Sequence, residues 1–343
     1  MKKAIWGKVI FSRVIPPAET ACMDLSIIII NWNSVGFLRT CLESVYRNTM
    51  DVEFEVIVLD NGSFDKCGEM LAQEFPQVRF LQGDKNLGFA RGNNLAASHS
   101  RGSTFLFLNP DTEIRGPALK ILYDSLCSLP DAGAIGARLI NSDGTLQTTC
   151  LQTFPTIANK ILDSNFVQRL FPKAKFLGTD PLFAQSDRPM PVEGISGACL
   201  MTSKEVFRKV SGFSEDYFMY FEDMDFCLKV IRSGYKNYFI PNAVIVHHGG
   251  KSAGGEYSRF SNVMMAESGW EFFCKQQGYY YALMYRVILA VKAVFISCIL
   301  GAALMFSFEK KKRAQITGAL GKWIHILGWC LGTEQWVKTL RAK

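Results

Sequence analysis

The chain has 343 residues, of which 48% are hydrophobic and 20% are charged, so it is globular and a disordered chain is excluded. Its 38 Lys and Arg residues outnumber its 31 Asp and Glu residues, and the formal net charge of +7 suits an anionic partner such as a nucleotide or a membrane surface. Basic and aromatic residues do not interleave as in a nucleic-acid-binding module, so we expect no nucleic acid partner.

The first 23 residues are expected to form an N-terminal arm. They are basic at the start but lack the continuous apolar core of a signal peptide. Met23 directly precedes the first apolar run and is a second candidate for the start of the protein.

Strands and helices alternate over the next part of the chain. Apolar, often β-branched runs predict buried strands at 25–30, 54–59, 78–81 and 104–108. Helical spacing of apolar residues predicts helices at 36–47, 65–75 and 86–99. This order predicts βαβ units and therefore an α/β fold with a mostly parallel central sheet. Right-handed crossovers place the ends of successive strands along one edge of that sheet.

A turn-rich segment follows residue 130 and completes a domain that we expect to cover residues 24–275. Short strands are predicted near Ala134 and at 194–201, and a late strand at 238–246. Helices are predicted at 204–210 and 223–233. The ten cysteines are scattered without a C-x-x-C pair, which gives no zinc pattern and indicates reduced thiols in a cytosolic protein.

Residues 276–343 are expected to form a third, helical and membrane-associating region, in which Tyr279–Phe308 is strongly apolar. Arg286 and Lys292 interrupt it, and the longest uncharged run, Ala293–Phe308, has sixteen residues, short of the roughly 20 that span a bilayer. A basic run at 309–313 precedes a second apolar segment. We therefore expect amphipathic helices that dock on a membrane surface, with a helical hairpin packed within the protein or on a second subunit as the alternative.

An acidic turn follows the fourth predicted strand, in the sequence Asn109-Pro-Asp111. A carboxylate at the carboxyl end of a buried strand lies where open α/β sheets bind ligands. Oxygen ligands suit Mg²⁺ or Mn²⁺, so Asp111 is a candidate for a metal that holds a diphosphate. A simple Asn-Pro-Asp turn is the alternative.

Two further loops carry candidate nucleotide contacts. Asp60 follows the second strand and can accept from a pyrimidine N–H, although Asn61-Gly62 is also common turn chemistry. The stretch from Asn86 to Asn94 opens a helix with small residues and Arg91, which suits phosphate.

Two candidate sites for proton or metal chemistry lie later in the chain. Aromatic residues crowd Glu222, Asp223 and Asp225, and partial burial raises a carboxyl pKa and makes it a better base. Glu222 and Asp225 share a helix face that excludes Asp223, so a structural role for those two is at least as plausible. His247 and His248 end the late strand, and either can ligate a metal.

Taken in order, these motifs resemble the family 2 glycosyltransferases with the GT-A fold, in particular bacterial rhamnosyltransferases that build cell-surface polysaccharide. The resemblance covers residues 24–340. It is carried by Ile-Ile-Asn-Trp-Asn at 29–33, Leu-Asp-Asn-Gly-Ser at 59–63, Asn-Leu-Gly-Phe-Ala at 86–90, Leu-Asn-Pro-Asp at 108–111, Gly-Ala-Cys-Leu-Met at 197–201, Phe-Glu-Asp-Met-Asp at 221–225 and His-His-Gly-Gly-Lys-Ser at 247–252.

The resemblance implies a role for each matching residue. Asp223 would be the catalytic base, and Asp111 and His247 would bind Mg²⁺ or Mn²⁺, with His248 as the alternative ligand. Asn109 stands where the family usually has the first Asp of Asp-x-Asp, which lowers the charge of the metal site. The nucleotide-sugar would be bound by Asn31, Asp60, Asn61, Asn86, Gly88, Arg91 and Asn109.

The resemblance also implies a reaction and a location. The enzyme would transfer a sugar with inversion, L-rhamnose from dTDP-rhamnose, to a saccharide or lipid-linked saccharide at the cytoplasmic face of the membrane. One alternative is a UDP-sugar-dependent galactofuranosyl- or hexosaminyltransferase of the same fold. Another is a non-catalytic sugar-nucleotide-binding membrane scaffold. A homodimer is a further alternative for the oligomeric state.

Overall fold

The computed structural model describes residues 23–147, 150–162, 187–249 and 258–341. Residues 1–22 of the predicted N-terminal arm and the Gly-Lys-Ser end of the His-His-Gly-Gly-Lys-Ser motif lie outside these residues. The chain forms two compact units, which we call the sheet unit and the helical unit. Among the described residues, the sheet unit comprises 23–147, 150–154, 187–214 and 222–249, and the helical unit comprises 155–162, 215–221 and 258–341.

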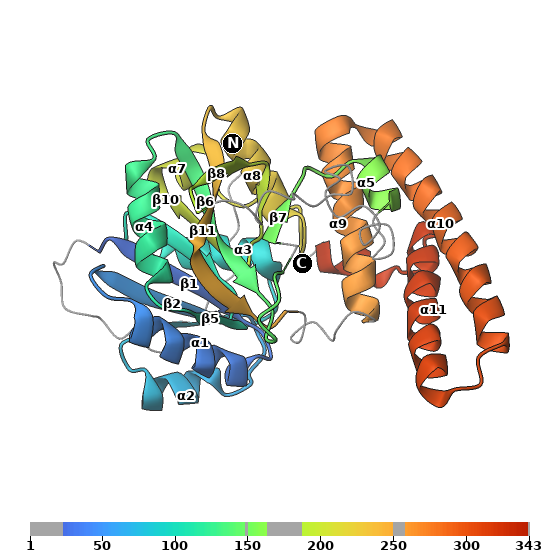
Figure 1. Cartoon of the computed structure of the whole chain (residues 1–343), viewed down its shortest axis with the longest axis horizontal. Helices are drawn as coiled ribbons and strands as arrows, with labels where there is room; N and C mark the ends of the chain where they lie inside the picture. Colours follow the sequence, from blue (N-terminus) through green and yellow to red (C-terminus); the bar gives the residue numbers. More distant parts are fainter. Residues whose placement is uncertain (1–22, 148–149, 163–186, 250–257, 342–343) are drawn as a thin grey trace. The chain divides into compact units, whose positions relative to one another are not determined.

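The sheet unit is built on a nine-stranded sheet with the order β3-β2-β1-β4-β10-β6-β11-β5, in which β8 pairs with β11 (Figure 1). Its first half is parallel and consists of β3 (Arg79–Gln82), β2 (Phe54–Asp60), β1 (Leu25–Asn31) and β4 (Thr104–Leu108). Residues on both faces of β1 and β2 are buried, as expected for strands covered on both sides. The predicted α/β fold and its four parallel strands are confirmed.

The second half of the sheet is mixed. β10 (Cys199–Ser203) runs antiparallel to β4 and to β6 (Ala132–Ile140). β11 (Lys236–His247) is parallel to β6 but antiparallel to β5 (Thr112–Ile114) and β8 (Met190–Val192). β7 (Leu151–Gln152) and β9 (Gly194–Ile195) form a separate two-stranded sheet. β5 was not predicted from the sequence, and its pairing with β11 brings Thr112 opposite His247.

Six helices belong to the sheet unit among the described residues. They are α1 (Val35–Asn48), α2 (Cys67–Glu74), α3 (Gly88–Ser98), α4 (Ala118–Ser128), α7 (Lys204–Lys209) and α8 (Glu222–Arg232). α2 and α3 begin two residues later than predicted, so Asp65 and Asn86 lie in loops. Helix α4 was not predicted, although its buried Leu119 and Leu122 have helical spacing.

The helical unit contains α5 (Ile157–Leu162), α9 (Arg259–Gln277), α10 (Tyr279–Met305), α11 (Lys310–Cys330) and α12 (Trp336–Arg341). Helices α10 and α11 form a hairpin that also packs on α9 (Figure 1). The predicted domain boundary at residues 275/276 falls within α9 and stays a prediction.

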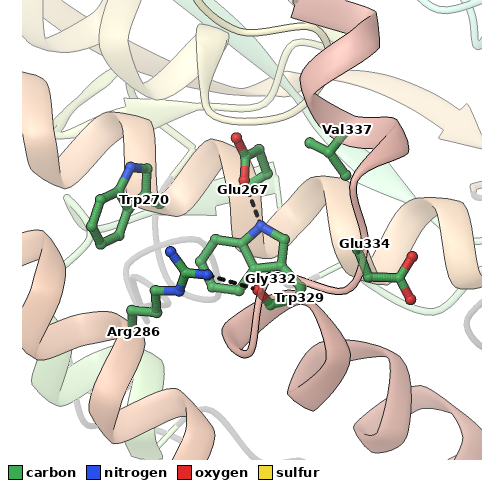
Figure 2. Close-up of a pocket in the computed structure, with 7 residues that line it drawn as sticks. All are labelled: Glu267, Trp270, Arg286, Trp329, Gly332, Glu334 and Val337. Carbon is green, nitrogen blue, oxygen red and sulfur yellow. Dashed lines mark hydrogen bonds between the residues drawn. The ribbon is translucent and has the colours of Figure 1, made fainter.

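Arg286 of α10 ties the three long helices together. Its guanidinium lies near the rings of Trp270 and Trp329, and it donates to the carbonyls of Trp329 and Cys330 at the end of α11. The last carbonyls of a helix lack intrahelical N–H partners, and Arg286 supplies a donor to both of these, although the Trp329 carbonyl also accepts from the Gly332 N–H at 3.0 Å. Trp329 in turn donates from Nε1 to Glu267 (Figure 2). In the small pocket of Figure 2, these hydrogen bonds join three of the lining residues, Glu267, Trp329 and Arg286.

The length of α10 corrects one expectation. The helix continues through Arg286 and Lys292 to a length of 27 residues, because both cations face tryptophan rings of neighbouring helices. By length and composition alone it could cross a membrane. The uncharged run Ala293–Phe308 therefore underestimates the length of the apolar helix α10.

Gly62 offers a test of the local backbone. Its φ is +73°, and an added Cβ would lie 2.5 Å from the carbonyl carbon of Lys85. We expect Gly62→Ala to lower the free energy of unfolding by at least about 1–2 kcal/mol, because the left-handed conformation alone costs that much. Chemical denaturation measures this.

Gly36→Ala is the matched control, since a Cβ there would have no neighbour within 4 Å and lies in α1. It should leave stability unchanged or raise it by up to about 1 kcal/mol. Equal losses in the two variants would contradict the described conformation at Gly62.

Candidate functional site

The carboxyl ends of the parallel strands carry a cluster of hydrogen-bonded polar side chains. Asn31 ends β1 and pairs in register with Asp60 at the end of β2. Asn31 Nδ2 donates to Asp60 Oδ1 over 3.1 Å and to Asp65 Oδ1 over 3.1 Å. Asn31 Oδ1 is buried and has no hydrogen-bond partner among the described residues, so an acceptor for a ligand remains in this cluster.

Asp60 is fully buried and accepts several hydrogen bonds from the protein. Its Oδ2 accepts from Gln82 Nε2 at 2.7 Å and from the backbone N–H of Phe64 at 3.0 Å. Its Oδ1 accepts from Asn31 and from the Ser63 hydroxyl. A carboxylate has about four acceptor positions. The predicted contact of Asp60 with a base stays a prediction, and it requires one of these donors to move.

A group of possible metal ligands lies at the same place, formed by Asp60, Asp65 and Cys67. Asp65 Oδ2 accepts from the backbone N–H groups of Ser34 and Val35 at 2.9 and 3.0 Å, where α1 begins. Burial raises the pKa of Asp65, but hydrogen bonds from Asn31 and Cys67 outweigh it and the pKa lies below its ordinary value. Burial raises the pKa of the Cys67 thiol far above its ordinary value. The backbone N–H groups that bind Asp65 at the start of α1 give this carboxylate the role of a helix cap.

Asn61 fastens the loop that precedes α3. Its Nδ2 donates to Asn86 Oδ1 at 3.0 Å and to the Gly88 carbonyl at 3.1 Å. Its Oδ1 accepts from the backbone N–H of Leu87 at 2.8 Å. The structure thus brings Asn61, Asn86 and Gly88 together, and Arg91 follows in the first turn of α3. A fixed helix start next to an arginine is suited to an anion.

Asp111 and His247 form the closest contact between predicted metal ligands. Asp111 is 3% exposed, and its Oδ1 lies 3.3 Å from His247 Nε2. Two ligands about 2.1 Å from one cation and at right angles to each other are about 3 Å apart. Two acceptor atoms this close repel unless a cation or a proton lies between them. The Asp111 and His247 atoms therefore fit a divalent cation. Asn109 Nδ2, 3.4 Å from His247 Nε2, is a hydrogen-bond donor that a cation bound to Nε2 would replace.

The neighbours of the two histidines distinguish their roles. His247 Nδ1 lies 2.7 Å from Gln147 Oε1, so it donates and leaves Nε2 as an acceptor. His248 has protein partners on both nitrogens, with Glu113 at 2.7 Å from Nε2 and Ser142 at 2.7 Å from Nδ1. This geometry favours His247 over His248 as the ligand.

Asp223 is held at the start of α8 by backbone donors. Its Oδ2 accepts from Gly197 N–H at 2.9 Å and its Oδ1 accepts from Met224 N–H at 2.8 Å. The neighbouring Ala198 carbonyl accepts from Asn109 N–H at 3.0 Å. Gly197 and Ala198 therefore form backbone hydrogen bonds with Asp223 and with the Asn-Pro-Asp turn, respectively. The predicted base thus lies near the turn that carries Asp111.

The other two acids of the cluster are buried in structural positions. Asp225 is fully buried, accepts from the Ser214 hydroxyl and lies 3.8 Å from Lys229 Nζ. Burial, followed by the charges of Asp223 and Asp225, raises the pKa of Glu222 well above its ordinary value. The prediction that Asp223 differs from both neighbours agrees with these contacts, although its catalytic role is untested.

Gln147 and Gly197 were not predicted as parts of the site. Gln147 lies between predicted elements, and a lone Gln in a turn-rich stretch gives no signal of its own. Gly197 was part of a predicted motif, but its contribution became clear only from the structure, where its N–H donates to Asp223.

Comparison with known proteins relates this geometry to a family. The model described as glycosyl transferase family 2 matches residues 26–210, and one described as glycosyl transferase family group 2 matches residues 150–331. An uncharacterized Sinorhizobium fredii protein, y4gI, is 30% identical over 263 residues, which are 74% of this chain but only 27% of that protein. The N-acetylglucosaminyl-diphospho-decaprenol L-rhamnosyltransferase of Mycobacterium tuberculosis is 27% identical over 210 residues, 58% of this chain and 68% of the relative.

A solved structure shares the fold. The mannosyltransferase of Pyrobaculum calidifontis in complex with GDP-Man and Mn²⁺ superposes with a TM-score of 0.50, covering 93% of this chain and 90% of that one. The sequences are 15% identical, so this likeness concerns the fold alone.

The Asp111–His247 pair leads to a test with a nucleoside diphosphate. We expect thymidine diphosphate to bind the wild type more tightly with Mn²⁺ than without, because a bridging cation offsets phosphate charge. Asp111→Ala and His247→Gln should each remove most of that metal-dependent gain in calorimetric titrations. His248→Gln is the control and should retain it. An identical response to Mn²⁺ in all four proteins would place the metal elsewhere.

Proposed function

The chain belongs to glycosyl transferase family 2, and from that premise we propose that it transfers a sugar from a nucleotide-sugar to an acceptor hydroxyl in one inverting displacement. The observation that carries the proposal is the Gly197–Ala198 segment. It holds Asp223 through one backbone group and the turn of Asn109 and Asp111 through the next. A base and the turn that carries one metal ligand, held by one segment, suit a reaction with one proton acceptor and one charged leaving group.

Asp223 is the proposed base. A sugar hydroxyl has an intrinsic pKa far above 7, so its attack is faster when a carboxylate accepts the proton as the bond forms. Backbone N–H groups of Gly197 and Met224 fix both carboxylate oxygens. Such fixed orientation reduces the rearrangement needed to reach the acceptor. One displacement needs no nucleophile on the opposite face of the sugar.

The leaving nucleoside diphosphate is the second requirement. Asp111 and His247 would hold Mg²⁺ or Mn²⁺ there, and the cation would offset the charge that develops on the leaving phosphate. Arg91 and the start of α3 are proposed to bind phosphate oxygens. Asn31, Asp60, Asn61, Asn86, Gly88 and Asn109 are proposed to bind or frame the nucleotide-sugar.

The donor is proposed to be dTDP-L-rhamnose and the acceptor a lipid-linked saccharide. Support comes from the motifs of the sequence and from the rhamnosyltransferase relative, whose name states a diphospho-decaprenol acceptor. At 27% identity the donor sugar can differ, and a UDP-sugar enzyme of the same fold is the alternative. Mass detection of glycosylated lipid after incubation with each nucleotide-sugar separates these donors.

The helical unit is proposed to dock on the cytoplasmic face of a membrane. One side of α10 exposes an apolar stripe that includes Leu283, Val287, Val291, Phe295 and Ile299. Arg286 and Lys292 face tryptophans instead, so they leave this stripe uncharged. The other side packs on α9 and α11, which favours a helix lying in the interface over one surrounded by lipid.

We expect Asp223→Asn to lower kcat by about two to four orders of magnitude, the usual effect of losing a general base. Asn keeps the size of the side chain but cannot accept the proton, so donor binding should remain near the wild-type value. Steady-state transfer assays together with calorimetry of donor binding measure both quantities.

Asp124→Asn is the control for that substitution. Asp124 is 56% exposed on α4, pairs with Lys120 and has no role in the proposed reaction. Its kcat should stay within about twofold of the wild type. Turnover of Asp223→Asn at the control's level would remove Asp223 as the base.

Anionic vesicles test the docking surface. Replacing Lys310, Lys311, Lys312 and Arg313 with Gln should weaken binding to phosphatidylserine vesicles, because each basic residue near the surface contributes about 1 kcal/mol. The charge-matched control replaces four exposed basic residues of the sheet unit with Gln, namely Arg39, Arg115, Lys120 and Lys236. Sedimentation with vesicles should be reduced in the first variant and retained in the control.

Phe295→Asp provides a second vesicle-binding variant. Phe295 is 65% exposed, and the substitution should weaken vesicle binding because its burial in lipid would be lost. Resistance of the wild type to alkaline carbonate extraction would show that α10 spans the membrane. Failure to bind vesicles, together with a dimer in solution that Phe295→Asp dissociates, would assign the stripe to a second copy of the chain.

A further inference from the structure

A continuous chain of hydrogen bonds leads from a surface carboxylate to the metal-ligand pair. Thr145 Oγ1 lies 2.6 Å from Asp143 Oδ1, and Asn141 Nδ2 lies 2.9 Å from Thr145 Oγ1. Gln147 Nε2 lies 3.3 Å from Asn141 Oδ1, and Gln147 Oε1 lies 2.7 Å from His247 Nδ1. The other ring nitrogen of His247 faces Asp111.

The chemistry of the first member sets the direction of every bond in this chain. An ionised carboxylate only accepts, so the Thr145 hydroxyl donates to Asp143 and accepts from the amide nitrogen of Asn141. The amide oxygen of Asn141 then accepts from Gln147 Nε2. Gln147 Oε1 is left facing His247, whose Nδ1 therefore carries the hydrogen. Hydrogen bonds from the Thr145 side chain and backbone lower the pKa of Asp143, which keeps it ionised.

The backbone around Gln147 is held by the same turn. Asn141 N–H donates to the Thr145 carbonyl at 2.7 Å, and Gly144 N–H donates to the Asn141 carbonyl at 2.9 Å. Gln147 N–H donates to the Leu139 carbonyl at 3.0 Å, just past a bridge between Ile140 and Leu146. The amide of Gln147 is thus presented to β11 by a closed hairpin turn.

We propose that Gln147 is a positioning residue that holds His247 in the Nδ1–H tautomer, so that Nε2 offers its lone pair to a divalent cation shared with Asp111. This inference rests on the proposed function, which places the metal at that pair. A metal-binding histidine gains a fixed ring orientation and a more basic ligand atom when its other nitrogen donates to an acceptor. Asn109 Nδ2, 3.4 Å from Nε2, is a donor, which is consistent with a lone pair on Nε2 that a cation would take over from it.

The tautomer itself is the first readout, because it can be measured without metal. Long-range ¹H–¹⁵N spectra of the metal-free protein, recorded at basic pH, distinguish the protonated ring nitrogen. We expect Nδ1–H for His247 in the wild type and in Gln147→Glu, which keeps an acceptor oxygen. Gln147→Leu should show the Nε2–H form or a mixture. An Nε2–H tautomer in the wild type would overturn the proposal.

Mn²⁺ affinity is the second readout. Gln147→Leu should weaken Mn²⁺ binding by about 10- to 100-fold, the usual effect of removing such a partner, whereas Gln147→Glu should restore it. Ser142→Ala is the matched control, since it removes the corresponding hydrogen bond from His248 and should leave Mn²⁺ affinity unchanged. Thermal melts show whether each variant is folded.

The two readouts separate this inference from the proposal on which it rests. A wild type that binds no Mn²⁺ would overturn the metal site itself and with it this role of Gln147. Wild-type binding that persists unchanged in a folded Gln147→Leu would overturn the role of Gln147 alone. Equal losses in Gln147→Leu and Gln147→Glu would also overturn it, because the acceptor oxygen would then be irrelevant.

Discussion

The antiparallel ladder between β5 and β11 determines where the proposed metal ligands meet. Thr112 pairs with His247 in this ladder, and the backbone N–H of His248 donates to the carbonyl of Asp111 at 2.9 Å. These backbone bonds bring the turn after β4 against the end of β11 across more than one hundred residues of chain. The short distance between Asp111 Oδ1 and His247 Nε2 follows from that ladder, and so does the choice of His247 over His248.

Around this ladder the site is assembled from loops that fasten one another. Asn61 holds the loop before α3, Asp65 holds the start of α1, and the Gly197–Ala198 segment holds both Asp223 and Asn109. Such fixed loops reduce the ordering that a ligand would otherwise require. At Asp60 these protein hydrogen bonds compete with the predicted ligand contact. Its oxygens already accept from protein donors, so a contact with the base would require one donor to be displaced.

The sequence was sufficient for features that depend on local pattern. Buried strands 25–30 and 54–59 were evident from their β-branched runs, and parallel pairing then placed Asn31 beside Asp60. The sequence was insufficient for β5, because this three-residue strand is defined by its pairing with the distant β11. It was also insufficient for Gln147, because the proposed role of this residue depends on its contact with His247 in the folded chain. That α10 continues through Arg286 and Lys292 was not evident from the sequence for a similar reason, since tryptophans from α9 and α11 accommodate the two cations.

The measurement that tests the metal site most directly is pulsed electron paramagnetic resonance of Mn²⁺ bound to protein with ¹⁵N-labelled histidine. The account predicts coupling to one histidine nitrogen that disappears in His247→Gln and persists in His248→Gln. Absence of histidine coupling in the wild type, or its loss only in His248→Gln, would contradict the assignment of Asp111 and His247 as the metal ligands.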